Sequence, residues 1–76
     1  MRQKVVIKVV SMSDHKTRKK ALKTVVSCFG VDSIALQGES KDKIEVIGEG
    51  MDAVTITKSL RKNVGHAEIV NLGPVD

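Results

Sequence analysis

The chain has 76 residues, which is enough for one small domain with a limited hydrophobic core. Hydrophobic residues make up 41% of the chain but aromatic residues only 1%, so the core must be built from aliphatic side chains. The net charge of +4 favours acidic partners, and the single cysteine excludes an intramolecular disulfide framework and suits a reducing compartment. No apolar stretch approaches the roughly 20 residues of a membrane span. We therefore expect a single cytoplasmic domain over residues 1–76.

A first strand is predicted over residues 4–10, where β-branched residues partly alternate with lysines. Successive side chains of a strand point to opposite faces, so one set can face a core while the other set faces away. The inward set is Val5, Ile7 and Val9, and the outward set is Lys4, Val6 and Lys8.

A basic amphipathic helix is predicted from His15 to about Ser27, a run without Gly or Pro. Ser13 or Asp14 can accept hydrogen bonds from the N–H groups that open it. Apolar residues recur at three- and four-residue spacing, and Lys and Arg cover much of the remaining surface. The apolar stripe contains Ala21, Leu22, Val25 and either Val26 or Cys28.

The middle of the chain predicts a β-hairpin. Phe29 is expected to act as an apolar plug, and Gly30 as the stop of the first helix. Residues 31–37 and 42–48 then have strand-like composition, and the polar segment 38–41 between them is a predicted turn.

The last third predicts a second helix over residues 53–64, capped by Asp52 and ended by Gly65. A final strand follows over residues 67–72, and Gly73-Pro74 is expected to break it. The order is βαββαβ, which predicts an α+β ferredoxin-like sandwich with a four-stranded antiparallel sheet and two helices on one face. The inward residues of the second helix are Ala53, Ile56, Leu60 and Val64.

The junction between the first strand and the first helix carries Met12, Asp14 and Thr17. In heavy-metal-associated (HMA) domains and copper chaperones, the same junction carries Met-x-Cys-x-x-Cys, whose two thiolates bind Cu(I). Here the methionine remains, while Asp14 and Thr17 occupy the two cysteine positions. The loop therefore resembles a metal-binding loop without its thiolate ligands.

The resemblance to plant HMA domains extends over nearly the whole chain. It is closest to the heavy-metal-associated isoprenylated plant proteins and to the HMA domains integrated into plant immune receptors. It implies a metal-independent protein-interaction domain, without a cofactor, that is bound by a secreted fungal effector as a host target or as an integrated decoy. The segments that carry it, beside Met12, are 4–10, 30–33, 42–46, 60–62, Gly65 and 67–68.

Residual copper or zinc binding, as in a metallochaperone, is the alternative function. Asp14 and Thr17 offer a carboxylate and a hydroxyl, which are a poor pair for a soft metal. A surrogate site could use Met12, His15 and His66, since the loop before the last strand lies near the metal loop in this fold. Two ring nitrogens without a defined third ligand seldom make a tight site. We expect Met12 to pack under the loop and both histidines to be solvated.

Catalysis and base recognition find little support in the sequence. Cys28 has no neighbouring cysteine or paired base, so we expect it to pack as a small hydrophobe, and we predict no enzyme activity. RNA-recognition motifs share this order of elements but stack bases on aromatic residues, and this chain has only Phe29. Sequence-specific nucleic-acid binding is therefore not expected. Nonspecific attraction of the basic helix to phosphates or anionic lipids stays open.

The exposed face of the sheet is the predicted protein-binding surface, because it combines apolar and charged residues. The outer edge of the sheet can accept a partner strand through its backbone, which also permits a homodimer. The other interpretation is a surface that only keeps the domain soluble. The predicted interface residues are Lys8, Ser33, Asp42, Lys43, Glu45 and Ile47 toward one partner side, and Glu68, Val70 and Asn71 toward another.

Overall fold

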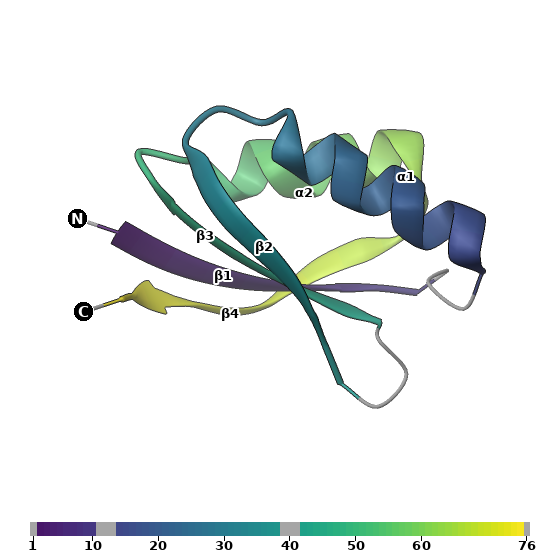
Figure 1. Cartoon of the computed structure of the whole chain (residues 1–76), viewed down its shortest axis with the longest axis horizontal. Helices are drawn as coiled ribbons and strands as arrows, with labels where there is room; N and C mark the ends of the chain where they lie inside the picture. The colour runs from purple at the N-terminus through teal and green to yellow at the C-terminus, as the bar shows by residue number, and fades with distance from the viewer. Residues whose placement is uncertain (1, 11–13, 39–41, 76) are drawn as a thin grey trace.

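The computed structural model describes residues 2–10, 14–38 and 42–75. Within them, four strands form one antiparallel sheet in the order β2-β3-β1-β4, and both helices lie on one face of it (Figure 1). The predicted ferredoxin-like fold is confirmed. The elements are β1 (Arg2–Val9), α1 (His15–Val26), β2 (Val31–Gln37), β3 (Lys43–Glu49), α2 (Ala53–Asn63) and β4 (Ala67–Pro74).

The hydrophobic core lies between the sheet and the two helices. β1 is a central strand, paired with β3 on one side and with β4 on the other. Its inward residues Val5, Ile7 and Val9 are fully buried, as their alternation predicted. Helical side chains complete the core from the other layer, including Ala21, Val25, Ile56 and Leu60.

The outward face of β1 differs from the expectation at one position. Val6 lies on the open face of the sheet, but only 6% of it is exposed. In the strand register Val6 lies opposite Glu45 on one side and Asn71 on the other, and longer polar side chains can cover a valine in the middle of a sheet.

The first helix begins at an Asp cap and ends close to the predicted residue. The Asp14 carboxylate accepts a hydrogen bond from the Lys16 backbone N–H at 3.4 Å. Val26 is 58% exposed whereas Cys28 is half-buried against the core, which decides between the two alternatives for the apolar stripe. The remaining stripe residues Ala21, Leu22 and Val25 are buried or partly buried.

The predicted apolar plug at Phe29 is wrong, because 86% of this residue is exposed. Gly30 follows with a φ of +86°, and a Cβ built on it would lie 2.8 Å from the Met51 backbone nitrogen. The chain segment around Met51 thus occupies the space beside this turn. Met51 itself is 6% exposed and joins the core in place of Phe29.

The second half of the chain follows the prediction except at its last strand. Asp52 caps α2, and Ile56 and Leu60 are buried, while Ala53 and Val64 pack against the core. β4 continues through Gly73 to Pro74 instead of ending at residue 72. Proline is tolerated there because β4 is an edge strand and Pro74 is its last residue.

Candidate protein-binding surface

The open face of the sheet is the side that the helices leave uncovered (Figure 1). The strand register places the outward residues of the four strands in three rows across the sheet. In strand order the rows are Ser33, Ile47, Lys4 and Gly73; Ala35, Glu45, Val6 and Asn71; and Gln37, Lys43, Lys8 and Glu68.

The middle row combines a buried valine with polar neighbours. Val6 lies at its centre between Glu45 and Asn71. The Gln37 side-chain amide donates a hydrogen bond to a Glu45 carboxylate oxygen, which orients this carboxylate toward β2. Glu45 therefore has a defined position on the open face, as a specific partner contact would need.

The third row places two lysines directly opposite each other. Lys43 on β3 is the register partner of Lys8 on β1, and Glu68 on β4 lies on the other side of Lys8. Like charges directly opposite in a sheet are destabilising. No described carboxylate forms an ion pair with either ammonium group. This pair is therefore suited to receive an acidic group from outside the domain.

The edge strand β4 exposes apolar side chains. Ile69, Val70 and Leu72 are 39%, 51% and 54% exposed. A register shift opposite Val6 and Ile7 leaves Val70 without a register partner on β1, which is the signature of a β-bulge. Among the described strands β4 is an edge strand, so the backbone on its outer side can pair with another chain.

A shallow groove separates α2 from β4. It is lined by Val54, Thr57, Lys58, Arg61 and Ile69. The Arg61 guanidinium Nε donates a hydrogen bond of 2.8 Å to the Ala67 carbonyl oxygen, which ties the helix to the first residue of the strand. With Val54 56% exposed, the groove adds apolar area beside the strand edge.

The structure brings together seven of the nine predicted interface residues on the open face. The exceptions are Asp42, which is half-buried just before β3, and Val70, which lies at the bulge. Asp42 instead supports the sheet, since its backbone carbonyl accepts the Val9 N–H at 2.8 Å. Sequence reasoning missed Ile69 and Leu72, although their closeness to Val70 in one short strand signals an apolar edge. The seven are Lys8, Ser33, Lys43, Glu45, Ile47, Glu68 and Asn71.

Asp14 and Thr17, at the cysteine positions of the metal-binding loop that this chain resembles, lie in the opening turn of α1. One Asp14 oxygen accepts the Lys16 N–H, and the Thr17 hydroxyl lies 3.5 Å from the other, a long contact for a hydrogen bond. The pair thus helps to start the helix. Met12, the third residue of the predicted loop, lies outside the described residues.

The histidines considered as surrogate ligands are both exposed. The His66 carbonyl oxygen accepts the Val10 N–H at 3.1 Å, so the loop before β4 lies beside Val10, the last described residue before the first loop. Among the residues that the structure describes, no group of three or more His, Cys, Asp or Glu side chains is placed to hold a metal ion.

Cys28 is half-buried at the end of α1, as expected for a packing residue. Its Sγ lies 3.4 Å from the Thr24 carbonyl oxygen, a distance that allows a thiol hydrogen bond. Burial raises the pKa of the thiol, against a smaller lowering effect of a hydrogen bond with Ser59. The neutral thiol is therefore favoured near pH 7, and the reactive thiolate is not.

This geometry defines the class of protein as an α+β ferredoxin-like domain, in which Asp14 and Thr17 form the start of α1. Neither described helix has the length and hydrophobicity needed to span a bilayer. No protein-family profile matches the chain.

Comparison with curated proteins identifies the group. The chain is 42% identical over 73 residues to the disease resistance protein Pik-1 of Oryza sativa subsp. japonica, covering 96% of this chain and 6% of that protein. It is 38% identical over 76 residues to the heavy metal-associated isoprenylated plant protein 16 of Arabidopsis thaliana, covering the whole chain and 48% of that protein. The rice disease resistance protein RGA5 is 42% identical over 69 residues, 91% of this chain and 6% of that protein.

The chain belongs to the heavy-metal-associated domains of plants. It spans less than half the length of each of these three relatives. The resemblance noted from the sequence is confirmed. The relatives of the chain include both disease resistance proteins and isoprenylated plant proteins.

Proposed function

We propose that this domain is a metal-independent protein-interaction module whose open sheet face and β4 edge bind a secreted fungal effector, as a host target or as an integrated decoy. The observation that carries the proposal is the Lys8–Lys43 pair, set beside the oriented Glu45 carboxylate on the sheet face opposite α1 and α2. Similarity to rice disease resistance proteins supports an immune context for this binding.

The two parts of the surface would contribute differently. Lys8 and Lys43 repel each other, so an acidic partner group placed between them would gain attraction and relieve that repulsion. The Gln37–Glu45 hydrogen bond would present one fixed negative group to a basic partner residue. Beside these charges, the backbone edge of β4 would supply main-chain hydrogen bonds by strand addition.

The chemistry of the first loop supports metal independence. Cu(I) prefers thiolates and Zn(II) thiolates or imidazoles, whereas Asp14 and Thr17 provide oxygen atoms that serve the start of α1. We expect the domain to bind its partner equally well with and without a metal chelator.

The test of the interaction begins with a pull-down by the 76-residue domain from infected and uninfected plant tissue. The affinity of the recovered protein is then measured for the wild type, Glu45→Arg and Lys43→Glu. We expect each reversal to weaken binding about tenfold or more while the Tm changes by only a few degrees. Lys62→Glu, an exposed charge reversal on α2, is the matched control and should bind as the wild type does.

Two results would contradict this assignment. If binding tolerated every charge reversal on the open face, the surface would be wrong. If Cu(I) or Zn(II), titrated against a competing chelator, bound stoichiometrically with submicromolar affinity and both His15→Ala and His66→Ala abolished that binding, metal independence would be wrong.

A further inference from the structure

The two helices are strongly basic, whereas the rest of the chain has a net negative charge. Five of the thirteen basic residues and all nine acidic residues lie outside α1 and α2. The helices therefore carry +8, and the remainder of the chain carries −4. The eight basic residues of the helices are Lys16, Arg18, Lys19, Lys20, Lys23, Lys58, Arg61 and Lys62.

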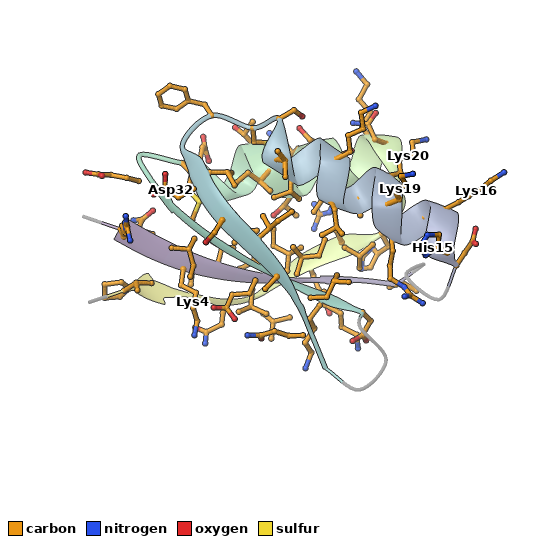
Figure 2. All side chains as sticks on the ribbon, in the orientation of Figure 1. Lys4, His15, Lys16, Lys19, Lys20 and Asp32 are labelled. Atoms are coloured by element: carbon orange, nitrogen blue, oxygen red, sulfur yellow. The ribbon has the colours of Figure 1, made fainter. Side chains whose placement is uncertain are left out.

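The α1 lysines are exposed and directed away from the open face. Figure 2 shows Lys16, Lys19 and Lys20 projecting from α1, whereas Lys4 projects from the opposite side of the sheet. No described carboxylate forms an ion pair with Lys19, Lys20 or Lys23. A cluster of single-sign charge without internal neutralisation attracts an anionic surface.

Apolar side chains lie next to these lysines. Phe29, the only aromatic residue of the chain, is 86% exposed, and Val26 is 58% exposed. Phe29 lines an open groove between the two helices together with Lys20 and Lys23. Lysines beside an exposed aromatic ring are typical of protein surfaces that lie in a membrane interface. There the ammonium groups contact the lipid headgroups and the ring lies below them.

We propose that the helical layer binds an anionic lipid membrane, with Lys19, Lys20 and Lys23 at the acidic headgroups and Phe29 and Val26 inserted at the interface. A nucleic acid would use the lysines for its phosphates but would give no role to exposed Val26. An acidic protein would need directional partners, whereas a lipid surface requires only a basic face with an apolar rim. Because this surface is opposite the open sheet face, the domain could hold a membrane and a protein partner at the same time.

The test uses vesicles of phosphatidylcholine alone and vesicles with about 30% phosphatidylserine, in about 0.15 M salt. Binding is measured by flotation, and insertion is measured with Phe29→Trp, which introduces a single fluorescent indole because the chain has no Trp. We expect binding to the acidic vesicles only, with a blue-shifted emission of the indole.

The matched variants separate location from net charge. Replacing Lys19, Lys20 and Lys23 together by Gln should weaken vesicle binding roughly a hundredfold, from about fivefold per lysine near an anionic surface. Replacing Lys4, Lys8 and Lys43 together by Gln changes the net charge equally and should have less than a tenth of that effect. Circular dichroism and the Tm verify that both triple variants are folded.

Three results would overturn the proposal. The first is the absence of binding to acidic vesicles, and the second is an equal loss in both triple variants, which would indicate attraction by net charge alone. The third is tighter binding of a single-stranded RNA or an acidic peptide than of the vesicles, with the same dependence on the α1 lysines. None of these results bears on effector binding, which uses the other face.

Discussion

The two outer surfaces of this domain differ in how their charged residues are distributed. The helical layer carries Lys and Arg without one acidic residue in either helix. The open sheet face interleaves lysines with Glu45 and Glu68, a buried valine and small polar residues. A surface of one sign attracts at long range and is weakened by salt, whereas a mixed surface discriminates between partners at contact distance. The modest net charge of +4 is therefore the sum of a uniformly basic helical layer and a remainder of the chain that is net acidic.

Truncating a buried side chain between the helices and the sheet should produce the largest effect on stability. Leu60 is fully buried and packs α2 against the sheet. Leu60→Ala should lower the free energy of unfolding by about 2–5 kcal/mol, measured by urea denaturation, because it leaves a cavity in the core. Lys62→Ala, an exposed change on the same helix, should stay within about 0.5 kcal/mol of the wild type. A loss below about 1 kcal/mol for Leu60→Ala would mean that the layers are held together elsewhere.

A smaller but still clear loss is expected where β3 passes the turn after α1. A Cβ built on Gly48 would lie 2.0 Å from the Gly30 carbonyl oxygen, which is a backbone atom. Gly48→Ala must therefore shift one strand, and we expect a loss of about 1–3 kcal/mol in the free energy of unfolding.

Gly73 on β4 offers the matched control for this substitution. A Cβ built there meets no atom within 4 Å, so Gly73→Ala should leave the free energy of unfolding within about 0.5 kcal/mol of the wild type. Equal stability of the two variants would contradict the close approach of β3 to Gly30.

The two helix caps should differ in strength, with Asp52 the stronger. Its carboxylate accepts the Val54 and Thr55 N–H groups at 3.0 and 3.3 Å, whereas Asp14 accepts one N–H at 3.4 Å. We expect Asp52→Ala to lower the Tm at pH 7 by several degrees and Asp14→Ala to lower it less. The reverse order would show that the first loop holds α1 more firmly than its hydrogen bonds indicate.

The contribution of Asp52 should also depend on pH. Hydrogen bonds from the Thr55 backbone and side chain hold the pKa of this carboxyl below its ordinary value, with smaller contributions from Val54 and Lys58. A lowered folded-state pKa stabilises the protein above the ordinary carboxyl pKa of about 4, and this stabilisation is lost as the pH falls through the folded-state pKa. The Tm difference between wild type and Asp52→Ala should therefore shrink in acid. A constant difference down to pH 2 would argue against a charged cap.

Local patterns predicted the order of elements, the inward face of β1 and the cap at Asp52. They failed where distant segments compete for the same space. Phe29 was expected to act as an apolar plug at the end of the first helix, yet Met51, more than 20 residues later, occupies the interior position beside Gly30. The open face could be predicted because alternation sets which side chains point away from a core.

The details of the candidate binding surface depend on strand register, which cannot be read from the local patterns of a single sequence. The bulge at Val70 and the extension of β4 to Pro74 both arise from its pairing with β1. The cross-strand contact of Lys8 with Lys43 likewise appears only when β1 and β3 are aligned. Sequence reasoning could therefore place residues on the surface but could not determine which charges would become neighbours.

That contact leads to the smallest expected change in stability and the sharpest comparison of the two surfaces. Lys43→Gln removes one member of the opposed lysine pair, so it should raise the free energy of unfolding by about 0.2–0.5 kcal/mol, measured by urea denaturation. The same change should weaken binding of the protein partner, while vesicle binding through the α1 lysines stays nearly constant. Lys62 lies on the exposed side of α2, so Lys62→Gln should not combine a gain in stability with a loss of partner binding. If Lys43→Gln makes the domain more stable but a weaker binder of its partner, the lysine pair is unfavourable for folding and serves recognition. If the variant is less stable than the wild type, the two ammonium groups already have compensating neighbours.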